Sequence, residues 1–190
     1  SKRGPKGRWS ALIAPPKPQL DMESTDICWY AIHVRSRHEF RVVERLTKLG
    51  IEAFLPIVER VNRWKDRKKL VILPLFPGYL FVHISKNYHN ILSVLKIRGV
   101  VRFLEMVPGE PEPVPEDQVI FLKRLVENKE SLDPYPYLKE GQMVRIKRGP
   151  LTGVEGILVE RTGQHILVLS VDILRQGVSL KIDASEVELV

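Results

Sequence analysis

The chain has 190 residues, a formal net charge of +7, 44% hydrophobic residues and 28% charged residues. This composition is typical of a globular protein with a substantial core and excludes a disordered or fibrous chain. No apolar run reaches the roughly 18 residues that span a membrane, and the single cysteine, Cys28, excludes internal disulfides and a cysteine-based zinc site. We therefore expect a soluble, cytoplasmic protein.

Residues 1–26 read as a disordered tail. Four prolines interrupt this segment, and its apolar content is too low to offset the entropy of ordering. Met22 is a candidate native start, in which case the residues before it derive from a vector; alternatively, Lys2–Arg8 is a native basic arm.

Residues 27–130 form the expected first domain. β-Branched and aromatic runs predict strands at 27–34, 53–61, 70–84 (interrupted at 74–78) and 100–104. Apolar periodicity predicts helices at 37–49, 87–96 and 116–128, separated by a basic loop at 62–69 and a proline-rich loop at 108–115. In the first helix, Phe40, Val43 and Leu46 or Thr47 share the face that we expect to be buried. Short connections favour an antiparallel sheet, and hence an α+β fold.

Residues 131–138 contain Pro134 and Pro136 and predict a stiff linker. Residues 139–190 then form a second domain, in which turn residues separate short strands at nearly regular spacing. The predicted strands are 143–147, 156–160, 165–171, 178–182 and 187–189. This pattern is typical of a small β-barrel.

The positive charge is concentrated in the first domain. Residues 27–130 hold 18 basic and 12 acidic residues, a net of +6, whereas residues 131–190 hold 7 basic and 8 acidic ones. We expect the basic module to be the one that meets a polyanion, with an ordinary solvated surface as the alternative.

No enzyme site emerges from the sequence. The five histidines lack metal-ligand spacing, the glycine-rich stretch 149–156 has no Lys-Ser/Thr of a phosphate loop, and no Gly-x-Ser-x-Gly elbow occurs. We predict a protein that is not an enzyme and has no catalytic residues, no cofactor and no metal.

An aromatic run, Phe76-Pro-Gly-Tyr-Leu-Phe81, places three aromatic residues within six positions. If they are exposed, they form an apolar patch for a protein partner, to which each aromatic anchor would contribute about 2 kcal/mol. The alternative is that these rings belong to the core.

Two basic clusters remain. Arg35, Arg37, His38 and Arg41 span the end of the first strand and the first turn of the first helix, where positive charge opposes the helix dipole. This cost indicates a phosphate partner, unless the segment is simply an exposed turn. The Arg63–Lys69 run is predicted to be a basic hairpin tip with one aromatic residue, and it is either a nucleic-acid contact or a solvated loop.

Taken together, these motifs resemble the NusG family of transcription elongation factors. The resemblance to the family's N-terminal (NGN) domain rests on Trp29-Tyr30, Arg63–Lys69, Pro74–Val82 and Arg98–Val100, and Lys139–Gly156 is similar to the KOW motif. Both occur in the family's order and spacing. The resemblance implies an NGN domain with a four-stranded antiparallel sheet and flanking helices, followed by an SH3-like, five-stranded KOW barrel.

The resemblance also implies bacterial RNA polymerase as a partner. The positions that match the surface for the polymerase clamp helices are His33, Phe76, Pro77, Tyr79 and Phe81. Asn90, Ile91 and Leu92 match, by position, a region that reaches the opposite jaw in specialised members. Bridging the two sides would hold the clamp closed and suppress pausing, by binding alone.

Sequence-specific paralogues such as RfaH also touch the non-template DNA strand of the transcription bubble. The matching positions here are Arg35, Arg37, His38, Arg41 and Arg98. Splayed single-strand bases would be read by stacking and by arginine hydrogen bonds.

The turn Ile173-Leu174-Arg175 matches the KOW contact for a second partner, Rho or the ribosome. Leu174 replaces the aromatic residue of the housekeeping factor, and Arg175-Gln176 replace its Gly-Arg. This difference favours a specialised UpxY- or RfaH-like antiterminator. Because Gly149, Pro150, Gly153 and Gly156 disfavour a helix, we predict that the second domain is a barrel rather than the helical hairpin of RfaH-like factors.

Two alternatives stay open. One is a housekeeping NusG-type factor that couples polymerase to Rho or the ribosome. The other is a KOW-type ribosomal or RNA-binding protein. In each case we expect a monomer that makes no membrane contact.

Overall fold

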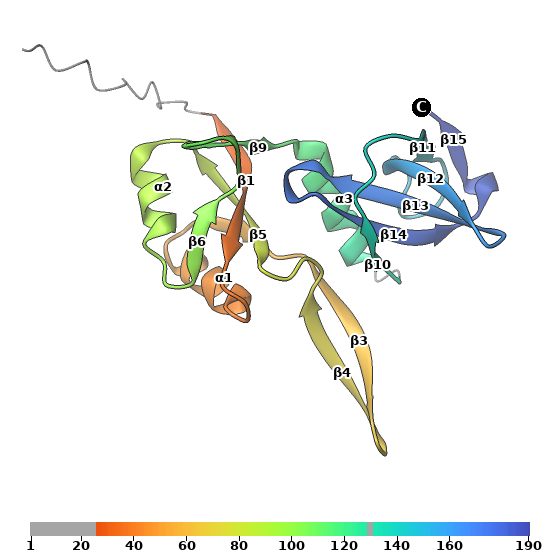
Figure 1. Cartoon of the computed structure of the whole chain (residues 1–190), viewed down its shortest axis with the longest axis horizontal. Helices are drawn as coiled ribbons and strands as arrows, with labels where there is room; N and C mark the ends of the chain where they lie inside the picture. The colour runs from red at the N-terminus through yellow and green to blue at the C-terminus, as the bar shows by residue number, and fades with distance from the viewer. Residues whose placement is uncertain (1–25, 129–130) are drawn as a thin grey trace, which may run out of the picture.

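The computed structural model describes residues 26–128 and 131–190 (Figure 1), so the predicted tail lies outside the described residues except for Asp26. The residues predicted as the first domain form β1 (Ile27–Val34), α1 (Glu39–Lys48), β2 (Glu52–Phe54), β3 (Ile57–Trp64), β4 (Arg67–Pro74), β5 (Tyr79–Ser85), α2 (Tyr88–Leu95), β6 (Val100–Phe103), β7 (Glu105–Val107), β8 (Glu110–Pro111), β9 (Pro113–Val114) and α3 (Glu116–Glu127). The residues predicted as the linker and the second domain form β10 (Asp133–Pro136), β11 (Gln142–Ile146), β12 (Glu155–Arg161), β13 (Gln164–Val171), η1 (Asp172–Leu174), β14 (Gln176–Ile182), η2 (Ala184–Glu186) and β15 (Val187–Leu189).

The first sheet has the order β2-β5-β1-β6, and its strand pairs are antiparallel. The central pair runs from Ile27 opposite Ser85 to His33 opposite Tyr79. A short strand that the sequence did not predict, β9, adds to β1 through Trp29 and Tyr30. The expected four-stranded sheet is therefore present with one extra strand.

Alternation along β1 sends its side chains to two different cores. Tyr30, Ile32 and Val34 pack with α1 and α2, whereas Trp29 and Ala31 pack with α3. The sheet is thus covered by helices on both faces.

Helix α3 lies between the two domains. Its Val119, Leu122 and Leu125 are fully buried, and they share one apolar cluster with Ala31 of the first sheet and Leu167 of the second. The two sheets are therefore joined by a continuous core that runs through α3, as its central place in Figure 1 suggests.

The second sheet has the order β10-β14-β13-β12-β11-β15. All five predicted strands are present, and no α-helix occurs between residues 139 and 190, which agrees with the prediction against a helical hairpin. The expected closed five-stranded barrel is not found among the described residues. The predicted linker supplies β10, which pairs with β14 along the edge that would have to meet β15 to close the ring.

The largest departure from the sequence prediction is the segment 57–74. Residues 62–69 were expected to form a loop, but β3 and β4 continue through them to a tight turn at Lys65-Asp66. The resulting hairpin extends away from both domains (Figure 1). A second departure concerns α1, where Phe40 is half exposed and the buried residues are Glu39, Val42 and Leu46.

Within the described residues, the helices are too short or too polar to cross a bilayer.

Candidate functional site

The aromatic run, Phe76–Phe81, forms a tight turn that leads into β5 (Tyr79–Ser85). We call this segment the aromatic turn. The amide of Tyr79 donates to the carbonyl of Phe76 (3.1 Å), and the carbonyl of Gly78 accepts from the amide of Val34 (2.8 Å). Gly78 has a φ of +84°, a backbone conformation that residues with a side chain rarely adopt. The glycine thus lets this turn lie directly against the end of β1.

The rings of this turn differ in exposure. Phe76 and Phe81 are buried, and Phe81 stacks on Phe54 with ring centroids 6.0 Å apart. Tyr79 is half-buried and stacks on His33 at 5.2 Å, while Pro77 is exposed. The alternative that the rings belong to the core therefore holds for Phe76 and Phe81, which the core that includes α3 encloses. An accessible surface remains at Pro77, Tyr79 and His33.

A buried carboxylate holds this turn in place. Glu39, the first residue of α1, is 4% exposed, and its Oε1 accepts a hydrogen bond from the amide of Gly78 at 2.9 Å. A carboxylate in the first turn of a helix is also stabilised by the helix dipole. Glu39 thereby connects the start of α1 to the aromatic turn.

The predicted basic residues come together beside this turn. Arg35 and Arg37 lie between β1 and α1, and Arg41 lies in the first turn of α1; all three are exposed. The amide of Arg35 donates to the carbonyl of Gly99 (2.7 Å), which brings Arg98 to the same place. A Cβ on Gly99 would lie 3.1 Å from Cβ of His38, so glycine permits this close approach.

We call Arg35, Arg37, Arg41 and Arg98 the arginine cluster. None of them forms an ion pair within the part of the chain that the structure describes. The half-buried His38 has Nδ1 3.0 Å from the carbonyl oxygen of Ser36, which orients its ring. Four unpaired guanidinium groups in one place form a surface suited to anions.

Sequence reasoning missed two further arginines. Arg45 donates from Nη1 to the carbonyl of Arg98 (2.9 Å) and so holds that turn against α1. Arg102 on β6 is exposed and lies opposite His33 in the strand register. The helical spacing of Arg41 and Arg45 could have revealed the first; the second depends on strand pairing.

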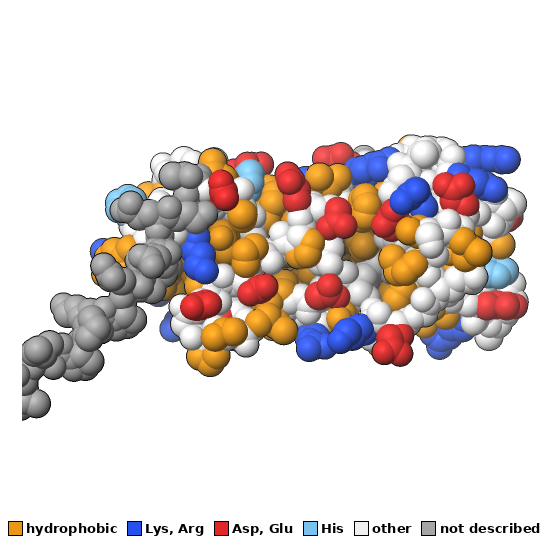
Figure 2. Space-filling model, turned by 90° about the horizontal axis from the view of Figure 1, so that it is seen from above, with side chains coloured by type: hydrophobic (Ala, Val, Ile, Leu, Met, Phe, Trp, Pro, Cys, Tyr) orange, Lys and Arg blue, Asp and Glu red, His pale blue; other side chains and the backbone are white. Residues whose placement is uncertain are grey.

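The charge is unevenly distributed over the surface. Figure 2 shows that the upper face of the first domain carries acidic side chains among hydrophobic ones, without an extended basic patch. The basic side chains are therefore not spread evenly over every face of the first domain.

The predicted α2 residues are half-buried. The amide of Asn90 donates to Oδ1 of the N-cap residue Asn87 (2.8 Å), and its Nδ2 donates to the carbonyl of Ser85 (3.0 Å). Asn90 thus stabilises the start of the helix. A polymerase contact through Asn90, Ile91 and Leu92 stays a prediction.

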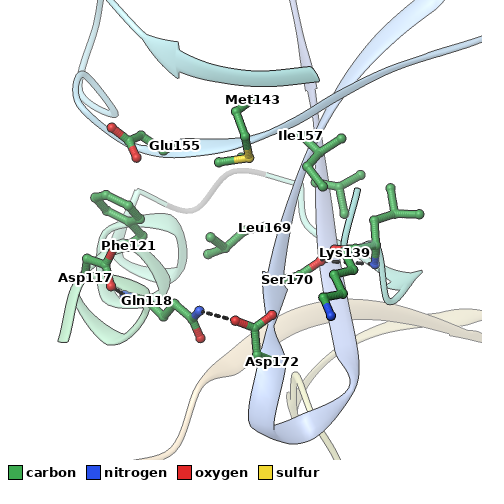
Figure 3. A pocket seen from close by; sticks show the side chains of 13 residues that line it. Asp117, Gln118, Phe121, Lys139, Met143, Glu155, Ile157, Leu169, Ser170 and Asp172 are labelled. Carbon is green, nitrogen blue, oxygen red and sulfur yellow. Dashed lines mark hydrogen bonds between the residues drawn. The ribbon is translucent and has the colours of Figure 1, made fainter. Parts of the chain in front are cut away.

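The described residues contain no group of three or more His, Cys, Asp or Glu side chains placed to hold a metal ion. A cavity of about 210 Å³ lies between α3 and the second sheet, where Gln118 Nε2 donates to Asp172 Oδ2 at 3.0 Å (Figure 3). Tyr137 donates to the other oxygen of Asp172 at 2.8 Å, and this hydrogen bond raises the pKa of Tyr137. The hydrogen bond from Gln118 ties the second domain to α3.

Comparison with known proteins identifies the family. Residues 27–123, more than half of the chain, match the family model described as "Transcription termination factor nusG". The chain belongs to the NusG family.

Relatives match beyond the first domain. The transcription termination/antitermination protein NusG of Escherichia coli K12 is 26% identical over 174 residues, covering 84% of this chain and 94% of that protein. Its counterpart from Buchnera aphidicola is 24% identical over 171 residues, with the same coverage. A solved structure titled "Domain interaction in Thermotoga maritima NusG" superposes with a TM-score of 0.51 at 24% identity, covering 87% of this chain and 98% of that one.

Residues 27–123, which match the family model, include both the aromatic turn and the arginine cluster. The predicted KOW partner site lies beyond this range. There Leu174 is buried in the shared core, whereas Ile173 is half-buried and Arg175 is exposed. Arg175 adopts a left-handed conformation (φ +52°), and its guanidinium lies over the Tyr137 ring at 5.2 Å.

Proposed function

We propose that this NusG-family chain acts as an antiterminator that docks on the clamp helices of RNA polymerase through the surface around Tyr79. In this proposal the arginine cluster holds the non-template DNA strand, and the complex resists pausing and termination. The observation that carries the proposal is the common support of the two surfaces. Glu39 and Val34 bind Gly78 of the aromatic turn, and the segment between them carries Arg35 and Arg37.

The docking surface would be small and centred on Tyr79. Its ring stacks on His33, and the exposed Pro77 lies two residues before it in the chain. A preformed aromatic pair loses little conformational entropy on binding, and such an anchor contributes about 2 kcal/mol when fully desolvated. The buried Phe76 and Phe81 would not contact the partner but would hold the turn in position.

The arginine cluster would meet the DNA at the edge of the docked domain. Arginine binds phosphates as a charge and can also bind a guanine edge with two hydrogen bonds, which gives about 1–3 kcal/mol of discrimination. Since the aromatic turn and the cluster share one scaffold, docking would fix the position of the arginines over the strand. The activity is one of binding, with no covalent step.

The choice of antitermination over Rho-dependent termination is supported by the KOW turn. Leu174 packs inward, so no large apolar side chain is fully exposed where a second partner would dock. The names of the related proteins include both termination and antitermination. The housekeeping role, with Rho-dependent termination, is therefore the competing function.

The test is in vitro transcription with purified bacterial RNA polymerase on a template with a pause site and a distal terminator. The wild-type chain should lengthen transcripts and shorten the pause. Tyr79→Ala should abolish the effect, whereas Tyr79→Phe, which keeps the stacked ring, should retain most of it. Thermal unfolding of each variant controls for loss of fold.

Two results would contradict the proposal. Rho-dependent earlier termination would indicate the housekeeping function. No effect on a generic template and none on the native leader DNA, combined with binding to ribosomal RNA, would indicate a KOW-type RNA-binding protein.

A further inference from the structure

The β3–β4 hairpin is an arm without a sheet to support it. Its two strands pair only with each other among the described strands, in unbroken register from Ile57 opposite Pro74 to Trp64 opposite Arg67. Each residue from 61 to 70 is exposed. A two-stranded ribbon is only marginally stable in water by itself, so the far half of this arm gains little from folding.

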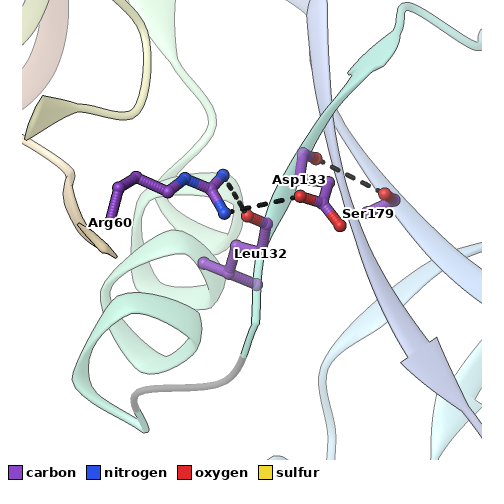
Figure 4. A network of polar contacts seen from close by, with 4 residues as sticks. All are labelled: Arg60, Leu132, Asp133 and Ser179. Atoms are coloured by element: carbon purple, nitrogen blue, oxygen red, sulfur yellow. Dashed lines mark hydrogen bonds and ion pairs between the residues drawn. The ribbon is translucent and has the colours of Figure 1, made fainter. Parts of the chain in front are cut away.

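The base of the arm is firmly anchored. Arg60 Nη2 donates to the carbonyl of Leu132 (2.6 Å), and its Nη1 lies 3.4 Å from Oδ1 of Asp133 (Figure 4). The amide of Leu75 donates to the carbonyl of Pro56 (2.8 Å) and closes the arm at its root. The arm therefore has a fixed root beside β10 and a free tip.

The tip of the hairpin, residues 63–69, carries a net positive charge that nothing in the described structure neutralises. It holds five basic residues and one acidic residue, Asp66, and none of the six forms an ion pair with a described residue. Arg63 and Lys68 stand directly opposite each other, although like charges in that arrangement destabilise a strand pair. The basic residues are Arg63, Lys65, Arg67, Lys68 and Lys69. Such a tip is complementary to a polyanion.

An aromatic ring lies among these charges. Trp64 is 77% exposed, the highest value among the large hydrophobic side chains of the described chain. By the strand register, its neighbours on the same face are Arg67, Asn62 and Lys69, whereas Val61, Leu70 and Ile72 lie on the opposite face. An aromatic anchor for a protein partner usually sits at the centre of an apolar patch. An isolated ring flanked by cations instead matches a platform for a nucleobase, with the cations on the phosphates.

We propose that the tip of this hairpin is a nucleic-acid-binding site separate from the arginine cluster. Trp64 stacks on an unpaired base, and Arg67 and Lys69, which share its face of the hairpin, bind the neighbouring phosphates. The site needs neither polymerase nor the Tyr79 surface, so it goes beyond the proposed function and can be tested apart from it.

The test measures binding of the full chain to a fluorescein-labelled single-stranded DNA of about 12 nucleotides by anisotropy. Trp64→Ala should weaken binding at least about fivefold, and Trp64→Phe should recover part of the loss. With an abasic oligonucleotide that has the same number of phosphates, Trp64→Ala should have no effect.

The charge contribution is tested by salt dependence. Arg67→Gln/Lys69→Gln should reduce the magnitude of the slope of log K against log salt by about 1.4, the value for two lost phosphate contacts on a single strand. The matched control is Lys147→Gln/Arg148→Gln, which neutralises another exposed basic pair, in the second domain. It should leave the slope unchanged. Circular dichroism and thermal unfolding should be unchanged in each variant.

Three outcomes would overturn the proposal. The first is wild-type affinity in the hairpin variants while Arg41→Ala/Arg98→Ala removes binding, since the contact would then lie wholly in the arginine cluster. The second is polyglutamate of equal charge binding as tightly as DNA with the same dependence on Trp64, which would indicate an acidic protein partner. The third is no oligonucleotide binding by the wild-type chain at low salt. Transcription assays of Tyr79 variants are independent of all three.

Discussion

The aromatic turn and the arginine cluster lie at the same end of β1, but the side chains of the first are largely buried and those of the second are exposed. Phe76 and Phe81 are fully packed and serve the core, whereas the arginines are exposed and form no ion pairs within the described structure. Changes in the turn should therefore affect stability and binding together. Changes in the cluster should affect binding alone.

The largest effect is expected at Phe81. This side chain is fully buried, so Phe81→Ala should lower the free energy of unfolding by about 3–5 kcal/mol, through lost transfer energy and a cavity. Urea denaturation measures the loss. The matched control, Phe40→Ala, truncates a half-exposed phenylalanine of α1 and should cost far less. Equal losses would mean that the turn is not part of the core.

Glu39 tests the link between the two surfaces. Glu39→Ala removes the acceptor for the buried amide of Gly78 and should cost about 1–3 kcal/mol, while also weakening polymerase binding. Glu39→Gln keeps an acceptor oxygen and should recover much of both. The control is Glu44→Ala on the same helix, whose exposed carboxylate pairs with Lys48 (3.0 Å) and should contribute little. If Glu39→Ala left the chain as stable as Glu44→Ala, the link would be refuted.

A smaller, pH-dependent effect should appear on the other face of β1. Burial raises the pKa of Tyr30 to about 12 from an ordinary value of 10.0. The unfolded chain therefore loses this proton before the folded one does, so the stability that Tyr30 contributes is present below pH 10 and is lost as the pH rises towards 12. Tyr30→Phe should remove this part of the alkaline destabilisation. An identical decline in the wild-type and Tyr30→Phe chains between pH 10 and 12 would argue against the burial.

The smallest effect on stability is expected in the arginine cluster. Arg41→Ala/Arg98→Ala should leave the free energy of unfolding within about 0.5 kcal/mol, as for most surface changes. The same variant should reduce the magnitude of the slope of log K against log salt, measured for single-stranded DNA, by about 1.4. Arg161→Ala/Lys181→Ala, an exposed basic pair in the second domain, is the matched control. A marked loss of stability in the cluster variant would break the comparison.

Much of the fold could be predicted from local patterns. Alternation and apolar periodicity located the strands of both sheets other than β9 and β10, and all three α-helices, to within a few residues, although the single predicted strand 53–61 is divided between β2 and β3. The sequence predicts the hairpin tip at 63–69 as a loop rather than as paired strands, because a polar, basic run has no buried face and only the cross-strand register shows the pairing. Pro134 and Pro136 predict a linker, yet they lie in β10, an edge strand, where proline is tolerated.

The candidate site was predictable where it is local in sequence. Arg35, Arg37 and Arg41 follow one another along the chain, but Arg102 reaches the site only through strand pairing. The sequence does not predict the role of Glu39 for a similar reason, because its hydrogen-bond partner lies 39 residues away. The burial of Phe76 and Phe81 depends on a core that includes α3, which follows much later in the chain.

The shared helix α3 has a consequence for how the chain is made. Synthesis runs from the N-terminus, and domains fold as units while the chain emerges. When α3 is complete, its residues can pack on the first sheet, but the side that meets Leu167 and Leu169 has nothing to cover it until the last 60 or so residues follow. A chain interrupted at this stage would carry an apolar helix face in water, and such faces promote aggregation. The second domain thus covers an apolar face of α3 that would otherwise be exposed to water.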